Sequence, residues 1–221
     1  MDGFVVLQIC LQCPHSSLRS ASASLLGEVC QNFEFAQNYV LENKLMNTLL
    51  DMIENDSNEE VQIKALYAVS CIVRNSPLAE KEFLKNDGLS YIMKAIISEK
   101  EKLVTKSCFL LSNIIASNDD SLETIFSMGY VEQIATVLYS HKTNDTSREF
   151  CSKILYDMSV KMPKFLDECL RPELNLITHF ESRLSEIKTN DQYLDEENVI
   201  KPFLELLKSR EINSSNSAVQ R

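Results

Sequence analysis

The chain has 221 residues, of which 22 are Lys or Arg and 32 are Asp or Glu, so its net charge is −10 at pH 7. Such an acidic chain does not suit phosphate backbones or anionic membranes as partners, because both attract clustered positive charge. Its hydrophobic fraction of 44% is ordinary for a globular protein, and its 4 Gly and 5 Pro are too few for a fold built on hairpins or phosphate loops, so we expect an all-α protein.

The first segment, residues 1–17, reads as part of a helical repeat that is already under way. Its apolar side chains Phe4, Val5, Leu7 and Ile9 would form the uncovered edge of a stack of repeats. We therefore expect either weak self-association through this N-terminal edge or a frayed first helix.

From residue 18 onward one helical block recurs along the chain. It reads LRSASASLLGEVCQN at 18–32, VQIKALYAVSCIVRN at 61–75, LVTKSCFLLSNIIAS at 103–117 and SREFCSKILYDMSVK at 147–161. The starts lie about 43 residues apart, which is the period of armadillo and HEAT-type repeats. Within the block the apolar residues follow helical spacing rather than the alternation of a strand.

A second block fills each interval with a short helix, a break and another helix, at 38–53, 82–97 and 124–139. Gly88 and Gly129 stand at matching places just before its second helix, as helix-stopping residues would. Each unit therefore has three helices, and such a unit must stack on its neighbours to bury its apolar face. Residues 18–161 thus predict a right-handed superhelical solenoid of about four armadillo-like repeats.

The C-terminal part differs from the repeats. More polar helices over 162–208 are expected to cap the solenoid, and Ser/Asn-rich residues 209–221 lack an apolar pattern and favour a disordered tail.

Cysteine usage indicates a reducing compartment. There are seven cysteines, and four of them lie inside helical patterns rather than in loops: Cys30, Cys71, Cys108 and Cys151. The first residues lack the basic start of a secretory signal, and no apolar run approaches the length of a membrane span. We expect a cytoplasmic protein, with the nucleus as a second compartment.

The sequence shows no constellation for catalysis or for a metal. Cys10 and Cys13 form a CxxC pattern near His15, but zinc would need a further ligand and a redox site would need a βαβ setting. His141 and His179 have no nucleophile with a supporting acid nearby. We expect no enzyme activity, no metal and no cofactor.

In armadillo units the third helix lines the concave face, and an aromatic residue stands four positions before an Asn. Phe109 and Asn113 keep this pair. The other units have Ser24 with Glu28, Tyr67 with Cys71, and Lys153 with Asp157. Because only one Asn remains, a groove that holds an extended peptide through an Asn ladder is disfavoured, and a concave face for a folded partner is favoured.

Several blocks together resemble the heat-shock-protein-70-binding protein family, the armadillo-type nucleotide exchange factors. They are VQIKALYAVSCIVRN at 61–75, EFLKNDGLSYIMKAI at 82–96, KSCFLLSNIIAS at 106–117, IFSMGYVEQIATVL at 125–138 and RPELNL at 171–176. The resemblance covers about residues 2–208 and favours the cytosolic branch of the family. It implies a co-chaperone whose concave face embraces the ATPase domain of heat shock protein 70 and promotes ADP release.

On this resemblance we expect partner contacts along the third helices. The candidate residues are Lys64, Tyr67, Cys71, Arg74, Asn75, Lys106, Phe109, Asn113, Lys153 and Asp157. Arg and Tyr are frequent interface anchors, and Arg74 is the strongest candidate. Alternatives remain open, because the lysines would also suit a solvated surface, the aromatic residues would suit packing between repeats, and Asn113 would suit a backbone bond. The alternative function is an armadillo scaffold that binds a peptide or another protein without exchange activity.

Overall fold

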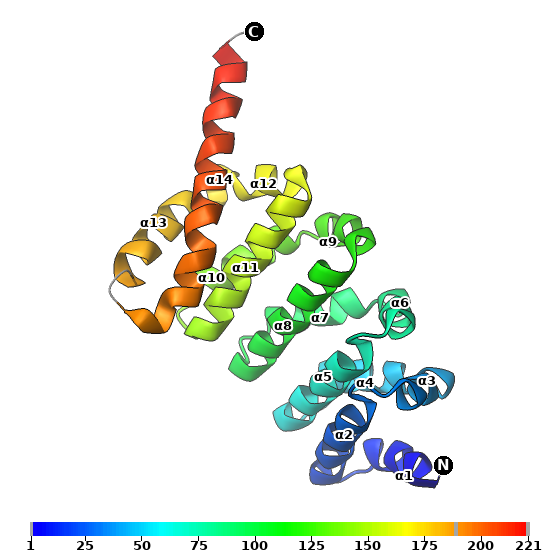
Figure 1. Ribbon diagram of the computed structural model, residues 1–221. Coiled ribbons are helices and arrows are strands. Elements are labelled where there is room, and N and C mark those ends of the chain that lie inside the picture. Colours follow the sequence, from blue (N-terminus) through cyan, green and yellow to red (C-terminus); the bar gives the residue numbers. More distant parts are fainter. Residues whose placement is uncertain (1, 188–189, 220–221) are drawn as a thin grey trace. The chain divides into compact units, whose positions relative to one another are not determined.

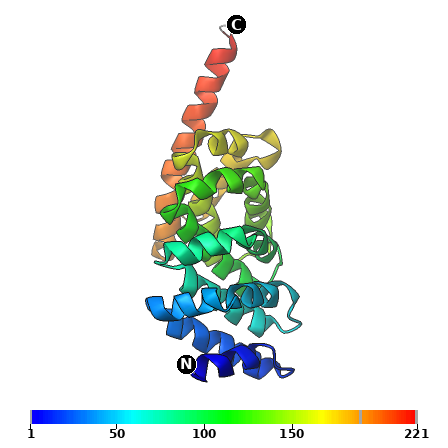
Figure 2. The same ribbon diagram turned by 90° about the vertical axis from the view of Figure 1, so that its right-hand side faces the viewer.

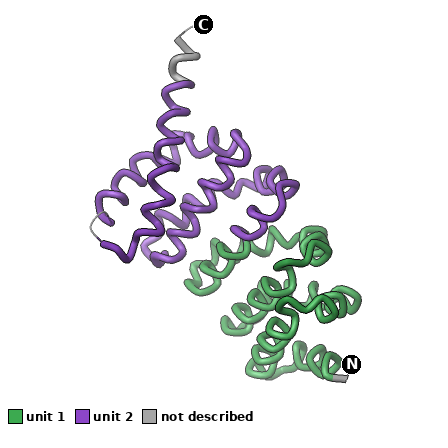
Figure 3. The backbone as a smooth tube through the Cα atoms, viewed as in Figure 1, with its two compact units in different colours: residues 1–110 green, residues 111–221 purple. Residues whose placement is uncertain are grey.

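The computed structural model describes residues 2–187 and 190–219, and every regular element within these ranges is helical. The chain forms two compact units, residues 1–110 (unit 1) and residues 111–221 (unit 2), which Figure 3 shows in green and purple. The expected all-α class is confirmed for the described part of the chain.

Unit 1 contains three-helix repeats in the predicted order, with long helices separated by pairs of shorter ones (Figure 1). The long helices are α2, α5 and the part of α8 up to residue 110, and they match the blocks predicted at 18, 61 and 103. The helices are α1 (Asp2–Leu11), α2 (Ser16–Cys30), α3 (Glu34–Glu42), α4 (Leu45–Asn55), α5 (Glu59–Val73), α6 (Pro77–Lys85), α7 (Gly88–Ile96) and the start of α8 (Glu101–Ser117).

Local sequence explains where these helices begin. The side chain of Asn58 accepts a hydrogen bond from the backbone N–H of Val61 at 3.3 Å, and Ser76 accepts one from Ala79 at 3.3 Å. Pro77 occupies the first turn of α6, where its missing N–H costs nothing. These caps begin α5 and α6 and so fix the repeat boundaries.

The corners of the repeats use left-handed backbone. Asn32 and Asn75, at equivalent places after α2 and α5, have φ of 56° and 60°, and the Asn75 side chain donates to Oδ1 of Asn32 at 3.1 Å. Lys44 and Asp87 occupy the next pair of equivalent corners, with φ of 55° and 56°. Asn and Asp tolerate this region better than most residues do.

The matched roles predicted for Gly88 and Gly129 need a correction. Gly129 has φ +73° and is the corner residue before α10 in unit 2, but the corresponding corner in unit 1 is Asp87. Gly88 is the first residue of α7 and is required for packing, because a Cβ there would lie 2.4 Å from the ring of Phe83. Within the repeat, Gly88 therefore lies one position after the place that Gly129 occupies. Gly88 serves close packing, whereas Gly129 serves the left-handed turn of the backbone.

The core of unit 1 lies between the long helices and the second short helices. Val61, Ala65, Val69 and Ile72 of α5 are each 0% exposed, as their helical spacing predicts. Burying each large aliphatic side chain contributes about 1.5–3 kcal/mol. Figure 2, turned by 90°, shows unit 1 from the side of its short helices α3 and α6.

Unit 2 contains the rest of α8 and further helices of 6 to 26 residues. Its elements are the rest of α8 (111–117), a 3-10 turn (Asp119–Ser121), α9 (Leu122–Ser127), α10 (Tyr130–Tyr139), α11 (Asp145–Lys161), α12 (Pro163–Cys169), a 3-10 turn (Pro172–Leu174), α13 (Leu176–Ile187), a 3-10 turn (Asp191–Tyr193) and α14 (Leu194–Val219). Phe165, Phe180 and Phe203 are fully buried, and the rings of Phe180 and Phe203 meet edge to face at 5.4 Å.

A buried ion-pair network ties the cap of unit 2 together. Arg183 of α13 donates to both carboxylate oxygens of Glu196 in α14, at 2.9 and 2.8 Å, and also to Asp145 of α11 at 3.2 Å. The Glu196 side chain is only 3% exposed. At the other end of α11, the Lys161 ammonium donates to the Ile115 carbonyl at 2.7 Å and so caps α8.

The C-terminal boundary differs from the composition-based expectation. Helix α14 continues beyond residue 208 to Val219, and Arg210 forms an ion pair with Asp167 of α12 at 2.8 Å. The first residues of the expected tail are therefore part of the helix, because a charged side chain anchors them to the cap. Residues 220–221 lie outside the described part of the chain.

All seven cysteines are free thiols. Cys10 and Cys13 are half-buried and the other five are buried. No described helix combines the length and the apolar character needed to cross a membrane.

Candidate partner-binding face

Five side chains from the long helices of unit 1 gather on one surface, which we call the third-helix face. They are Glu28 of α2, Tyr67 of α5, Arg74 directly after α5, and Lys106 and Phe109 of α8. Tyr67 lies about two turns before Arg74, and Lys106 and Phe109 are one turn apart on α8. Apart from Glu28, which is exposed, each of them is half-buried, as is usual for side chains that both pack and bind.

Two cation–aromatic contacts join α5 to α8. The Lys106 ammonium lies 5.6 Å from the centre of the Tyr67 ring, and the Arg74 guanidinium carbon lies 5.1 Å from the centre of the Phe109 ring. Each helix therefore supplies one cation and one ring. Such contacts hold a positive charge in place without neutralising it, unlike an ion pair with a carboxylate.

Arg74 has an incompletely satisfied guanidinium. Its Nε is buried and has no hydrogen-bond partner among the described residues. An unpartnered buried donor is destabilising by itself, by about 1–3 kcal/mol. Hydrogen bonding therefore does not explain the placement of the Arg74 Nε atom.

Room for the Tyr67 ring is made by a glycine that the sequence reading did not single out. A Cβ at Gly27 of α2 would lie 3.0 Å from the Tyr67 ring and 3.0 Å from the Cα of Ala68. Glycine in the middle of a helix costs roughly 1 kcal/mol relative to Ala, so its presence inside the 18–32 block was the available signal. Gly27 lets α2 approach α5 closely and sets the height of the ring.

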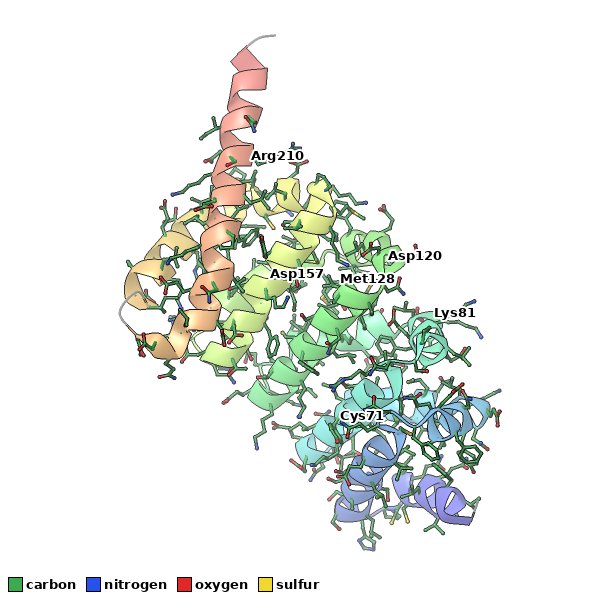
Figure 4. All side chains as sticks on the ribbon, viewed as in Figure 1. Cys71, Lys81, Asp120, Met128, Asp157 and Arg210 are labelled. Carbon is green, nitrogen blue, oxygen red and sulfur yellow. The ribbon has the colours of Figure 1, made fainter. Side chains whose placement is uncertain are left out.

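Cys71 lies behind the third-helix face rather than on it. It is 4% exposed, and Figure 4 labels it on α5. Its hydrogen bond with the Tyr67 hydroxyl is the main reason that the pKa of Tyr67 is raised. Burial raises the pKa of the Cys71 thiol, while nearby Arg74 and Lys106 oppose this effect. Cys71 thus supports Tyr67 and stays a neutral thiol.

The other two candidates in unit 1 lie away from this cluster. Lys64 is half-exposed and pairs weakly with Glu60 on the same helix, at 3.9 Å. Asn75 is exposed at the corner after α5, where its side chain already bonds Asn32. The structure therefore brings Tyr67, Cys71, Arg74, Lys106 and Phe109 together, with Lys64 and Asn75 at the periphery.

The remaining three candidates belong to unit 2. Asn113 is half-buried on α8. Lys153 and Asp157 of α11 form an ion pair with each other at 2.5 Å, and Figure 4 labels Asp157 on that helix. Their charges are largely satisfied within α11, so they offer less to a partner than Arg74 and Lys106 do. Partner contacts by all ten candidates remain a prediction.

The N-terminal edge is partly as expected. Val5 and Ile9 of α1 are 49% and 67% exposed, but Phe4 stacks on Tyr39 of α3 with ring centres 4.4 Å apart, and Leu7 is half-buried. The apolar edge is therefore smaller than predicted, because α3 covers its aromatic member. Weak self-association through it stays a prediction.

The described residues contain no group of three or more His, Cys, Asp or Glu side chains placed to hold a metal ion. Arg19 donates to the carbonyl oxygens of Cys13 and Pro14, at 2.8 and 2.9 Å, so the CxxC segment has a structural partner in unit 1.

Comparison with known families gives one match, to the model described as the SIL1/FES1/HPBP1 C-terminal domain, over residues 1–128. This range contains all of unit 1 and therefore the whole third-helix face.

Two relatives carry names that refer to Hsp70. The chain is 31% identical to Hsp70-binding protein 1 of Rattus norvegicus over 84% of this chain and 52% of that protein. It is 30% identical to Hsp70 nucleotide exchange factor FES1 of Saccharomyces cerevisiae over 81% of this chain and 70% of that protein. The chain thus spans about half the length of the first of these relatives.

Among solved structures, a computationally designed armadillo repeat protein for modular peptide recognition superposes with a TM-score of 0.74 at 14% identity, over 90% of this chain and 79% of that one. This likeness confirms the armadillo-like fold.

Proposed function

Because the chain belongs to the SIL1/FES1/HPBP1 C-terminal domain family, we propose that it is a co-chaperone that acts as a nucleotide exchange factor for heat shock protein 70. The names of the relatives in rat and yeast support this role. The proposed role requires binding and no catalytic chemistry, so we propose a protein that is not itself an enzyme. The free, mostly buried cysteines support action in the cytosol.

The observation that carries the proposal is the state of the cations on the third-helix face. Arg74 and Lys106 lie against aromatic rings, and the Nε of Arg74 has no hydrogen-bond partner among the described residues. A protein with a net charge of −10 thus keeps positive groups fixed on one surface. We propose that this face binds an acidic surface of the chaperone's ATPase domain, with Arg74 and Tyr67 as anchors.

Exchange follows from a difference in affinity. If the protein binds the open, nucleotide-free ATPase domain better than the closed one, it shifts the population toward the open state. By linkage, ADP weakens the binding of the exchange factor by the same factor by which the exchange factor weakens ADP. Ring-stacked cations suit this task, because they are ordered before the partner arrives and lose little conformational entropy on binding.

The test is the release of a fluorescent ADP from a purified cytosolic heat shock protein 70, measured with and without this protein. The wild-type protein should accelerate release, and Arg74→Glu should weaken binding by about 30-fold or more, as loss of an interface anchor worth ~2 kcal/mol does. Lys81→Glu is the matched control, because Lys81 is an exposed cation of α6 in the same unit (Figure 4). It should leave release unchanged.

Two other outcomes are informative. Binding without acceleration would support the alternative of an armadillo scaffold, which should depend more on Asn113 than on Arg74. No binding at all would reject the proposed function and leave the fold unaffected.

A further inference from the structure

A polar groove lies on unit 1 away from the third-helix face. It has a volume of about 520 Å³ and is formed by the end of α1, the start of α2 and the length of α4. Its surface is polar and apolar in similar measure, with amides, a hydroxyl and carboxylates beside an apolar floor. The lining residues are Leu11, Gln12, Arg19, Asn47, Thr48, Asp51, Met52, Asn55 and Asp56.

One carboxylate of the groove is already neutralised. Asp56 accepts from Arg19 at both oxygens, at 2.7 and 2.8 Å, and from the backbone N–H of Asn58 at 2.9 Å. The guanidinium of Arg19 is held as well by the carbonyls of Cys13 and Pro14. This pair forms a closed wall and leaves no unbalanced charge.

Asp51 is different. It accepts one hydrogen bond, from the Asn55 side chain to Oδ1 at 2.7 Å, and no described cation lies within ion-pair distance of it. The side chains of Gln12, Asn47 and Thr48 likewise have no hydrogen-bond partner among the described residues. The groove thus presents a negative charge surrounded by unused amide and hydroxyl groups.

In the next repeat, an ion pair within the chain occupies the position equivalent to this groove. The 43-residue offset between equivalent corners places Asp51 at the position of Lys94, and Leu11 at the position of Glu54. There, Lys94 of α7 forms an ion pair with Glu54 of α4. At the groove, the residue equivalent to Lys94 is the oppositely charged Asp51 and the residue equivalent to Glu54 is the apolar Leu11, so this ion pair is absent.

We propose that this groove binds a lysine-bearing segment of a partner protein, with a lysine ammonium paired to Asp51. The carbonyl oxygens of Gln12, Asn47 and Asn55 and the hydroxyl of Thr48 suit the donors of an ammonium. The side chains of Leu11 and Met52, buried beneath the groove, give an apolar floor for the methylene stem. The net charge of −10 attracts a basic segment from solution.

This site does not depend on the proposed exchange function, and it involves none of the residues of the third-helix face. The probe is an acetylated and amidated trilysine peptide, titrated into isotope-labelled protein at low salt. The readout is the side-chain amide resonances of Gln12, Asn47 and Asn55, which report on the groove itself. The reference peptide is the same trilysine with every ε-amino group acetylated.

We expect the three amide pairs to shift with trilysine and not with the acetylated peptide. Asp51→Asn keeps an acceptor for Asn55 but removes the charge, and it should weaken binding by about tenfold, as the loss of a charge-assisted hydrogen bond does. Asp51→Lys, which copies the charge found in the next repeat, should abolish binding. Glu42→Gln removes one exposed charge from α3 and should leave the affinity unchanged.

Three results would overturn the proposal. They are shifts spread over the acidic surface without preference for the groove, equal shifts with the acetylated peptide, and equal affinities for Asp51→Asn and Glu42→Gln. A thermal unfolding curve of Asp51→Asn that matches the wild type shows that lost binding is not lost folding.

Discussion

The two units are built from similar helices but use their charges differently. In unit 1 the cations of the third-helix face, Arg74 and Lys106, rest on aromatic rings. In unit 2, Arg183 and Lys164 also lie near aromatic rings, but each is paired with a carboxylate as well, that of Glu196 and of Glu123 respectively. Ion pairs fix a fold and consume charge, whereas cation–aromatic contacts fix a side chain and leave its charge for a partner. The third-helix face, which lies in the part of the chain that the family model covers, thus holds two cations with no ion-pair partner among the described residues.

The largest effect should come from breaking the ion pair of unit 2. Glu196→Gln leaves the largely buried Arg183 guanidinium without its main counter-charge and should destabilise unit 2 by about 3 kcal/mol. Urea unfolding followed by native-state hydrogen exchange measures this loss for each unit separately. The exposed Lys208–Glu181 pair is the control, and Glu181→Gln should cost below about 0.5 kcal/mol. Equal losses for both variants would show that the buried pair is not special.

Substitution of Gly88 and of Gly129 should separate packing from backbone strain. Gly88→Ala in unit 1 places a Cβ against the buried Phe83 ring and should cost about 2 kcal/mol through overpacking. Gly129→Ala in unit 2 meets no atom within 4 Å and should cost about 1 kcal/mol through its positive φ alone. Urea titrations of both variants decide the order. A larger loss at Gly129 would contradict the packing role of Gly88.

Two carboxyl groups, one in each unit, should contribute to the acid dependence of stability with opposite signs. The hydrogen bond from Arg19 lowers the pKa of Asp56, so this carboxylate stabilises unit 1 above about pH 4, and the stabilisation is lost as the pH falls through the lowered value. Burial, assisted by Asp195 and Glu196, raises the pKa of Glu149, so unit 2 loses stability as the pH rises through that value.

Single substitutions test this opposition. Asp56→Asn should cost unit 1 about 1 kcal/mol at pH 7 and flatten its acid response. Glu149→Gln should stabilise unit 2 by about 0.5 kcal/mol at pH 7 and have no effect near pH 3, where the wild-type carboxyl is protonated as well. Hydrogen exchange at the two pH values gives both numbers. If the two substitutions changed the acid response of their units in the same direction, the assignment would be refuted.

The smallest effect should be the coupling across the third-helix face. A double-mutant cycle with Lys106→Ala and Tyr67→Leu should return a coupling of about 0.5 kcal/mol in stability. The same cycle measured on binding to heat shock protein 70 should return a larger coupling, because the stacked ammonium is ordered for the partner. A coupling in stability above that in binding would mean that the contact serves the fold.

Much of this architecture was predictable, because stacked repeats recur in the sequence at a regular spacing. The blocks at 18, 61, 103 and 147 and their apolar spacing specify the long helices without knowledge of their neighbours. The pairing of Lys106 with Tyr67 was not predictable, since it depends on the height of one helix against the next, which Gly27 sets. Cys71 was predicted at the surface, but it follows Tyr67 by one turn and is covered by that ring. Arg210 shows how a single ion pair extends a helix into a segment of tail-like composition.

The cysteines differ in burial, so a thiol reagent should label some of them selectively. Burial raises the pKa of Cys30 to about 12 and that of Cys169 to about 12, so neither is a thiolate at neutral pH. Cys10 and Cys13 are half-buried, and in the chain they flank Leu11 and Gln12, which line the polar groove. A maleimide dye should therefore label the native protein at the end of α1 without engineered cysteines. Such a label would report on occupancy of the groove while leaving the third-helix face unmodified.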